Sequence, residues 1–496
     1  MTRRWLAALL LAASPALLAA DAVSPSPGAG KAAAAKAAVH EKSRCDLIVT
    51  AASVVTVDSA FRVVPDGAVA VKDGAIVAVG TRAEVTAKWA ARATVSRPGA
   101  ALMPGLVNTH THAAMSLLRG VADDRPLMEW LEKSIFPAEG KNVSPKFVTD
   151  GTLLAAAEMI RGGTTTFADM YYFEWDVASA VEKSGLRGVL GETWLDFPVA
   201  SHKDLPESIR VTRAFLTKWK GHPRVTAAVA PHAPYTCSKE TLLAAKALAD
   251  EFGAPLLIHL SETRDEQKTI LGKYGASPAS WLDSIGFLGP NVLAAHGVWL
   301  DAEDLKLLAA RKVKLSHNPE SNMKLGSGIA PVVAAMKAGV VVGLGTDGVA
   351  GSNNDLDMFD AMDFAGKLAK VQALDPTVLP ARDLIRMATI EGARALGMEA
   401  RIGSLEVGKR ADLVAVDLAT SRSQPWYDVT SAVVYSVKAS AVSLTVVDGK
   451  VLWDGRKVRT LDEARLLLTA AEWRSKIAAQ LAGGAEPAKA EGPVAR

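Results

Sequence analysis

Residues 104–112 read PGLVNTHTH, a short apolar run that ends in polar side chains and in two histidines, His110 and His112. Further apolar runs follow, and each also ends in a polar or ionisable residue: Asp169, Glu192, His232, His259, His296, His317 and Asp347. Stretches with helical spacing separate most of these runs, so the pattern predicts strands that alternate with helices. Eight such units predict an α/β fold of the TIM (β/α)8 barrel type, with a site at the carboxyl ends of the strands.

The helical spacing and the glycine stop of one segment support this interpretation. Residues 148–160 carry apolar side chains at helical spacing and stop at Gly162-Gly163, which predicts a helix with a glycine stop. An open, doubly wound sheet is the alternative architecture. It is disfavoured because no glycine-rich phosphate loop follows the first strand.

Composition excludes several classes of function. The 496-residue chain has a net charge of only +3 and no basic stripe interleaved with aromatic residues, so nucleic acid is not an expected partner. Hydrophobic residues make up 49% of the chain, which is enough for a large buried core. The two cysteines, Cys45 and Cys237, are far apart and predict neither a disulfide framework nor a zinc motif.

The regions that flank the barrel have a different sequence pattern. Residues 45–100 and 401–460 contain short β-like runs and Asp-Gly turns, whereas the barrel is expected over 101–400. The two flanking regions are predicted to pair as one small β-sandwich domain built from both chain ends.

The first residues are expected to direct export rather than to fold. Residues 1–22 combine Arg3 and Arg4 with a short apolar run and small residues, the layout of a secretory signal peptide. The run is too short for a stable membrane span. This predicts a periplasmic or secreted protein, or a cytoplasmic one if the start codon is misassigned. Residues 23–44 are expected to form a flexible linker, and residues 461–496 a C-terminal helix followed by a disordered tail.

A metal site is predicted where four of the strands end. His110 and His112 are two residues apart, so both imidazoles point to one side of an extended strand. His259 ends the apolar run 255–258, and Asp347 ends another, where a carboxylate is costly unless it is paired or bound to a metal. Three imidazoles and a carboxylate suit one divalent ion, most simply Zn²⁺, although Fe or Mn would also fit.

Two further strand-end residues are candidates for catalysis. Glu262 lies three residues after His259, where a carboxyl beside an activated water could carry protons; an exposed loop glutamate is the alternative. His296 ends the run 292–295 and could stabilise an oxyanion, or it could be a core histidine. Asp347 could accept the proton of the water. The sequence does not assign a role to His317.

Five segments together resemble the amidohydrolase superfamily, in its mononuclear deaminase and chlorohydrolase branch. They are PGLVNTHTH, HLSET (259–263), HGVWL (296–300), SHNPESNMKLGSG (316–328) and LGTDG (344–348). The resemblance covers residues 45 to about 458. Binuclear members of that superfamily bridge two metals with a modified lysine on the fourth strand. Here this strand ends at Pro231-His232, so the resemblance implies one metal.

A narrower resemblance is carried by residues 108–140, NTHTHAAMSLLRGVADDRPLMEWLEKSIFPAEG, which look like the 5′-methylthioadenosine/S-adenosylhomocysteine deaminases. The resemblance implies that Glu139 binds the ribose hydroxyls and that His232 faces the substrate. Surface exposure at a helix end is the alternative for Glu139. Trp130 could line the pocket or belong to the core.

The chain departs from that pattern after the third strand. Several members of the family carry an arginine there that meets the amino-acid tail of S-adenosylhomocysteine. Residues 188–194 read GVLGETW, and the nearest arginine, Arg187, comes before the strand end. The apolar 5′-methylthioadenosine is therefore the expected substrate, ahead of S-adenosylhomocysteine or adenosine.

The expected function is metal-dependent hydrolytic deamination of an adenine nucleoside, with release of ammonia. The alternatives are a deaminase or chlorohydrolase of free bases or s-triazines, and a non-catalytic nucleoside binder in the periplasm. A small-molecule nucleoside is the expected partner, and the family resemblance makes a homo-oligomer an expectation as well.

Overall fold

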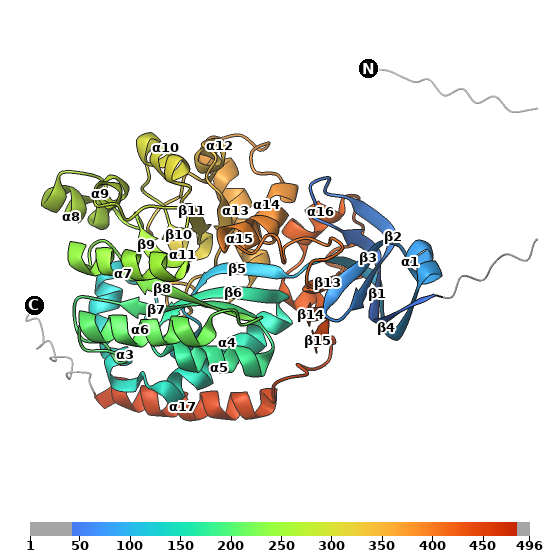
Figure 1. The fold of residues 1–496 in the computed structure, drawn as a ribbon, viewed down its shortest axis with the longest axis horizontal. Coiled ribbons are helices and arrows are strands. Elements are labelled where there is room, and N and C mark those ends of the chain that lie inside the picture. Colours follow the sequence, from blue (N-terminus) through green and yellow to red (C-terminus); the bar gives the residue numbers. More distant parts are fainter. Residues whose placement is uncertain (1–41, 484–496) are drawn as a thin grey trace, which may run out of the picture. The chain divides into compact units, whose positions relative to one another are not determined.

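The computed structural model describes residues 42–483 of the chain (Figure 1). The expected signal peptide at 1–22, the linker as far as residue 41 and the tail beyond residue 483 lie outside these residues. No helix within residues 42–483 combines the length and the apolar character needed to cross a membrane.

Eight parallel strands form a closed barrel, which confirms the predicted architecture. They pair in chain order, and the last strand closes on the first through Leu344 and Asn108. The strands are β5 (Leu106–Thr111), β6 (Thr164–Tyr171), β7 (Arg187–Trp194), β8 (Val225–Pro231), β9 (Leu256–Leu260), β10 (Val292–His296), β11 (Lys314–His317) and β12 (Val342–Leu344).

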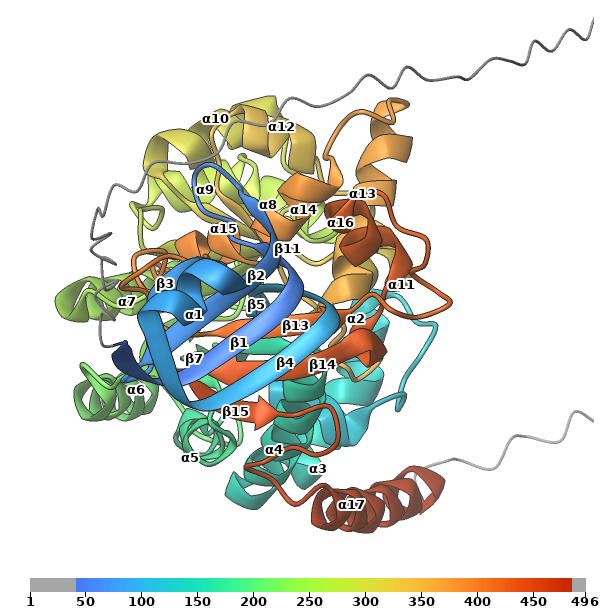
Figure 2. The same ribbon diagram turned by 90° about the vertical axis from the view of Figure 1, so that its right-hand side faces the viewer.

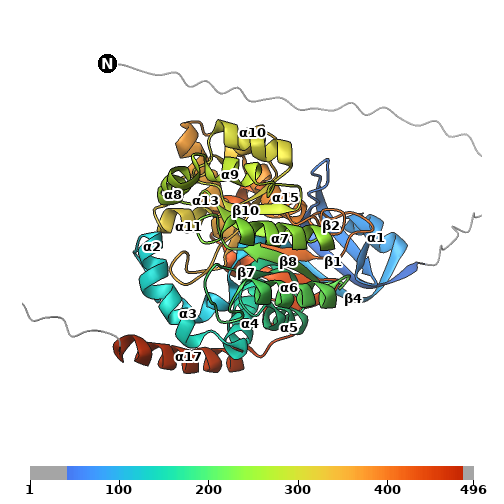
Figure 3. The same cartoon turned by 60° about the vertical axis from the view of Figure 1, so that its left-hand side comes forward.

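The barrel strands are buried on both faces because helices cover the outside of a core filled by inward side chains. Every residue of β6, β7, β9 and β10 is buried, as is typical of parallel sheets between helices. Helices α6 and α7, for example, lie against β8 (Figure 3). The helices between and after the strands are α4 (Pro145–Arg161), α5 (Glu174–Ser184), α6 (Leu205–Trp219), α7 (Lys239–Phe252), α8 (Arg264–Tyr274), α9 (Pro278–Ser284), α10 (Ala302–Arg311), α11 (Pro319–Lys324), α12 (Val332–Lys337), α13 (Met358–Ala373), α14 (Ala381–Met387) and α15 (Ile390–Ala395).

Helix α4 shows how local chemistry sets the boundaries. It begins three residues before the expected start because the Ser144 side chain accepts a hydrogen bond from Phe147 N and Pro145 occupies the first turn. It ends at Gly162, as the sequence predicts.

A second sheet, of seven strands, is built from both ends of the chain, as expected (Figure 2). Strand β4 joins its two halves, because it pairs parallel with β1 and antiparallel with β13. The strands form one curled mixed sheet around a shared apolar cluster that includes Val49, Leu102 and Leu444. In sheet order they are β15 (Lys450–Trp453), β14 (Val442–Val447), β13 (Leu413–Asp417), β4 (Trp89–Pro104), β1 (Ser43–Val55), β2 (Val63–Lys72) and β3 (Ala75–Thr81).

A buried ion-pair network joins the sheet to the barrel. Arg187, at the first residue of β7, donates to Asp412 at 3.1 Å and to Asp448 at 2.9 Å, and its side chain is only 1% exposed. It lies at the opposite end of β7 from the strand ends described below. The arginine near the third strand is therefore a structural anchor in this chain.

The remaining elements lie around the barrel and the mixed sheet, and helix α1 contacts β2 and β3. The C-terminal helix α17 packs against α4, where Trp473 Nε1 donates to Asp150 Oδ2 at 2.8 Å. These elements are α1 (Arg82–Lys88), the 3₁₀ turns Ala113–Leu118 and Ala439–Ala441, α2 (Leu127–Trp130), the π-helical turns Leu131–Ile135 and Ala432–Ser436, α3 (Phe136–Asn142), α16 (Val429–Ser431) and α17 (Glu463–Gly483).

Candidate active site

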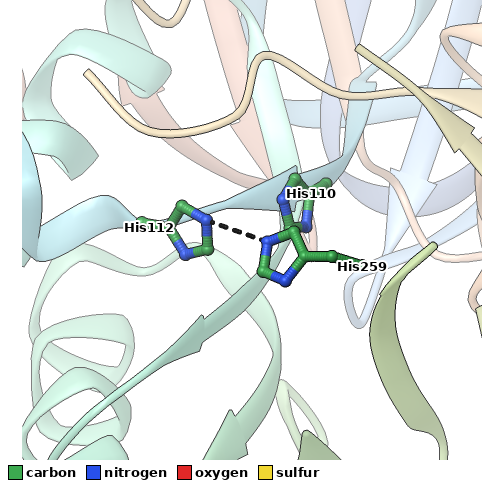
Figure 4. Close-up of side chains that lie close together, drawn as sticks. All are labelled: His110, His112 and His259. Atoms are coloured by element: carbon green, nitrogen blue, oxygen red, sulfur yellow. Dashed lines mark hydrogen bonds between the residues drawn. The ribbon is translucent and has the colours of Figure 1, made fainter. Parts of the chain in front are cut away.

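The four predicted metal ligands lie together at the carboxyl ends of three strands. His110 lies near the end of β5, His112 follows that strand, and His259 is in β9 (Figure 4). His110 Nε2 is 3.3 Å and His112 Nε2 is 3.2 Å from Asp347 Oδ1, and His259 Nε2 is 3.4 Å from His112 Nε2. The barrel therefore brings residues that are up to 237 positions apart within reach of one small ion.

The outer nitrogens of two imidazoles are held by backbone carbonyls. His112 Nδ1 lies 2.7 Å from Met170 O, and His259 Nδ1 lies 2.8 Å from His232 O. A carbonyl can only accept a hydrogen bond, so each Nδ1 carries its proton and each Nε2 faces the centre as the nitrogen available to a metal ion. Metal-binding histidines are oriented in this way.

Asp347 is oriented by donors on its other side. Ser321 Oγ donates to Oδ2 at 2.6 Å, and Gly348 N donates to Oδ1 at 2.7 Å. Burial opposes ionisation, but the neighbouring imidazoles of His110 and His112 hold the pKa of Asp347 well below its usual range. The side chain is therefore a carboxylate, and it needs a positive partner in this buried place.

The chemistry of this donor set fits a divalent metal ion. His110 Nε2 is buried without a hydrogen-bond partner among residues 42–483, although it faces the centre of the group. Its burial lowers the pKa of His110 to about 4, so the imidazole is neutral and can ligate. Three imidazole nitrogens and one carboxylate oxygen are a common ligand set for zinc and similar ions.

The backbone is strained at three of the strand ends. Ser261, His296 and Asp347 have φ angles of 53°, 74° and 66°, in the left-handed region that residues other than glycine rarely occupy. Such strain costs on the order of 1–3 kcal/mol per residue and is typical of functional sites, where it aims a side chain.

Glu262 lies beside the imidazole group and is buried. Its Oε2 is 3.8 Å from His296 Nε2, and burial raises the pKa of the Glu262 carboxyl. Glu266 holds the loop, because its carboxylate accepts from Ser261 N and from Glu262 N, each at 2.8 Å. His296 Nδ1 lies 3.0 Å from Asn322 Oδ1, which fixes the plane of the ring.

A cavity opens above these groups. It includes all the predicted substrate-binding residues, and no lysine or arginine of the described chain lines it. Its lining residues are His112, Met115, Leu127, Trp130, Leu131, Ile135, Phe136, Glu139, Met170, Tyr171, Tyr172, Thr193, His232, Tyr235, His259, Glu262, His296, Leu325, Asp347 and Ser352.

Glu139 is buried in the cavity wall and does not lie on the surface. Only 6% of the residue is exposed, and burial raises the pKa of its carboxyl to about 7. Tyr171 Oη donates to Glu139 Oε1 at 2.6 Å, which leaves Oε2 open to another donor. The sequence did not point to Tyr171; its position two residues after Asp169, at the end of β6, was the only signal available.

His232 and Trp130 also border the cavity. The ring of His232 lies 4.7 Å from that of His259, and its Nδ1 is 2.8 Å from Thr236 Oγ1. Trp130 is 5% exposed, and its Nε1 donates to Ala350 O at 2.8 Å. Trp130 therefore belongs to the core and to the cavity wall at once.

The other strand-end residues do not line the cavity. Asp169 Oδ1 accepts from Thr111 Oγ1 at 2.7 Å and from Ala113 N at 2.6 Å, which holds the chain around His112. His317 is buried outside the lining, and its burial lowers its pKa to about 3. Glu192 accepts from backbone N–H groups of residues 173 and 174.

Comparison with known proteins gives consistent matches. Residues 101–452 match the amidohydrolase family. The 5-methylthioadenosine/S-adenosylhomocysteine deaminase of Syntrophobacter fumaroxidans is 48% identical over 420 residues, which is 85% of this chain and 95% of that protein. The 5′-deoxyadenosine deaminase of Methanosarcina mazei is 45% identical over 440 residues, 88% of this chain and 99% of that protein.

A solved structure agrees with these matches. The crystal structure of an adenosine deaminase from Xanthomonas campestris with bound zinc superimposes with a TM-score of 0.87 at 42% identity. The match covers 88% of this chain and 100% of that one.

Proposed function

We propose that this chain, which belongs to the amidohydrolase family, hydrolytically deaminates an adenine nucleoside with the help of one divalent metal ion. One observation carries the proposal. A single cavity is lined by three members of the His/Asp group (His112, His259 and Asp347) and by the buried carboxyls of Glu262 and Glu139. The His/Asp group and Glu262 are the groups that hydrolysis needs, and Glu139 can bind a diol such as that of ribose.

His110, His112, His259 and Asp347 would hold the ion, which we propose to be zinc, as in the structure from Xanthomonas campestris. A zinc ion held there would supply an activated water for attack at neutral pH. Asp347 is the nearest carboxylate and accepts the proton that the water loses. Ser321 and Gly348 keep its oxygens aimed at the group during that transfer.

Glu262 acts as the proton carrier. Because burial raises its pKa, the carboxyl is protonated over a wider pH range than an exposed glutamate. It donates this proton to the ring nitrogen beside the amino-bearing carbon, which makes that carbon electrophilic. The Glu262 carboxylate then receives the proton that Asp347 took from the water and delivers it to the amino group. Ammonia leaves as the C–N bond breaks, and the hydroxyl proton of the adduct returns to Glu262 as the C=O bond forms.

His296 stabilises the tetrahedral adduct on the purine ring. Asn322 holds its Nδ1 side at 3.0 Å, so the Nε2 side faces Glu262 and the cavity. Asn318 Nδ2 lies 3.4 Å from the same Nδ1, and when Nδ1 accepts from this amide, Nε2 carries the proton and can donate to the oxygen where negative charge develops.

The 5′ group of the substrate is proposed to be small and apolar. The lining is mostly aliphatic and aromatic, and the part of the wall that the structure describes offers no cation to a charged amino-acid tail. Burial of a carboxylate without a partner is costly, so S-adenosylhomocysteine should bind less well than 5′-methylthioadenosine. Glu139 would accept hydrogen bonds from the ribose hydroxyls, and His232 and Trp130 would contact the nucleoside.

Ammonia release from 5′-methylthioadenosine, adenosine, S-adenosylhomocysteine, adenine and guanine tests the proposal in zinc-loaded protein. We expect the highest kcat/KM with 5′-methylthioadenosine. Glu139→Gln should lower kcat/KM for nucleosides about 10- to 150-fold, the value of one hydrogen bond to a charged group, and leave free bases unaffected. Glu129→Gln, next to Lys133 and outside the cavity lining, is the control.

Equal turnover of free bases and nucleosides would contradict the role of Glu139. Tight nucleoside binding without ammonia release would contradict catalysis altogether.

Export and assembly are separate proposals. The N-terminal layout of Arg3, Arg4 and the apolar run supports secretion or a periplasmic location, which cell fractionation with an antibody tests. Light scattering of the purified protein tests the expected homo-oligomer.

A further inference from the structure

A second group of ionisable side chains lies where helices α11 and α13 begin. Glu320, Asp355 and Asp360 each bring one carboxylate oxygen to within 4.8 Å of the others. Glu320 is in the first turn of α11, Asp360 is in the first turn of α13, and Asp355 is in the loop before α13. None of these residues lines the active-site cavity.

Glu320 is the exceptional member of this group. Only 8% of the residue is exposed, and its Oε2 is buried without a hydrogen-bond partner anywhere in the described chain. Burial, with Asp355 and Asp357 beside it, raises the pKa of the Glu320 carboxyl to about 9. A buried, unpartnered carboxyl oxygen is uncommon in folded proteins and calls for a ligand.

The charges around Glu320 are strongly unbalanced. Five carboxyl groups face only two ammonium groups, those of Glu320, Asp355, Asp357, Asp360 and Asp363 against Lys367 and Lys438, while the nearby Arg119 is paired with Glu158. Both lysines pair with carboxylates of α13. Lys438 contacts Asp360 and lies 3.3 Å from Asp363, and Lys367 lies 2.8 Å from Asp363. Within residues 42–483, neither Glu320 nor Asp355 forms an ion pair.

We propose that Glu320, Asp355 and Asp360 bind a hard divalent cation, with calcium as the best match. Calcium takes oxygen ligands at 2.3–2.6 Å, so two oxygens on one ion can be up to about 5 Å apart, which agrees with the spacing here. The all-oxygen donor set separates this site from the histidine site, which prefers softer ions.

The bound cation would connect three segments that support the active site. It would tie α11 to the start of α13 and to the loop that follows Asp347. Helix α11 carries Ser321, the donor to Asp347 Oδ2. The proposed role of the cation is therefore to stabilise these loops, and this role does not depend on the proposed reaction.

Calcium binding is measured in zinc-loaded protein, so that the histidine site does not contribute. Equilibrium dialysis against CaCl₂ with metal analysis gives the stoichiometry, and thermal unfolding gives the stabilisation. We expect about one calcium per chain and a saturable rise of Tm of about 2–5 °C. Glu320→Gln keeps the shape of the side chain and should abolish both effects, as should Asp360→Asn.

Glu303→Gln is the matched control, since Glu303 occupies the same position in the first turn of α10 but is exposed and pairs with Lys306. It should keep the wild-type response. Without calcium, Glu320→Gln should be at least as stable as the wild type, because burial and the neighbouring carboxylates oppose the ionisation of Glu320 and glutamine does not ionise; with calcium the order should reverse. No bound calcium in the wild type at 10 mM CaCl₂ (about 10 times the weakest binding of extracellular calcium sites), or undiminished binding in Glu320→Gln, would overturn the proposal.

Discussion

Replacement of Arg187 by methionine should destabilise the whole molecule without touching the active site. Its guanidinium bonds Asp412 and Asp448 and also donates to Pro223 O at 2.6 Å, at the junction of the barrel and the mixed sheet. Methionine fills a similar volume but leaves Asp412, which is 4% exposed, without its partner. Arg410 stays 2.7 Å from Asp448, so the loss falls mainly on Asp412.

The size of the expected destabilisation follows from the burial of the Arg187–Asp412 pair. Removing one partner of a buried ion pair costs about 3–5 kcal/mol, because the other charge stays buried and unpaired. An unfolding entropy of about 2.1 cal/mol/K per residue amounts to about 0.9 kcal/mol/K for residues 42–483. The expected decrease of Tm is therefore about 3–5 °C.

The loss should depend on pH. Burial already raises the pKa of Asp412, with Arg187 opposing the rise, so removal of Arg187 raises it further. An aspartate with a raised folded-state pKa binds its proton more readily in the folded than in the unfolded protein. Folding of the variant is therefore favoured as the pH falls, and its deficit relative to the wild type should shrink from pH 8 to pH 5.

Calorimetry at several pH values measures both effects. Arg401→Met is the control, because Arg401 also donates to Pro223 O, at 2.8 Å, but is exposed, and it should shift Tm by less than about 1 °C. A Tm within 1 °C of wild type for Arg187→Met, or a deficit that does not change with pH, would refute this account of the network.

Three further changes act on the active site. Glu262→Gln should leave zinc content unchanged and reduce kcat about 10²- to 10⁴-fold, as expected for a lost proton carrier; unchanged turnover in metal-replete protein rejects the role. Gly345→Ala would place a Cβ 2.5 Å from Asn318 Oδ1 and 2.9 Å from His110 Cβ, so zinc affinity should fall about 10- to 100-fold in a chelator titration, whereas Gly272→Ala, with open space around it, should not change it. Tyr171→Phe removes the 2.6 Å hydrogen bond to Glu139, and KM for nucleosides should rise about 5- to 10-fold with kcat nearly constant; a change confined to kcat would contradict a binding role.

The barrel was predictable because its strands carry two signals at once. Runs such as 255–258 are continuously apolar, and each ends in a polar residue that the fold must place at one rim. His110, His112, His259 and Asp347 could be grouped from sequence for this reason alone. Once these residues had been placed at strand ends, the rule that the parallel strands of a barrel end on the same face was enough to bring them together.

The hydrogen bonds and ion pairs that hold these residues in place could not be predicted from the strand pattern. Ser321 and Asp347 are 26 positions apart, Tyr171 and Glu139 are 32 apart, and Arg187 and Asp412 are 225 apart. No local pattern encodes such pairs, since each depends on which helix or loop the closed barrel places beside a strand. The 16-residue strand β4 was also hidden, because Pro98 and Gly99 interrupt its β-like pattern.

The position of β4 between β1 and β13 has a consequence for synthesis on the ribosome. More than 300 residues separate β4 from its partner β13, so about 15–60 s of translation pass before that partner emerges. During this interval β4 presents an unpaired edge to the cell, while the barrel strands β5 to β12 are being synthesised. A nascent chain that stalls before residue 413 should therefore be aggregation-prone, and chaperone capture should concentrate on its first hundred residues.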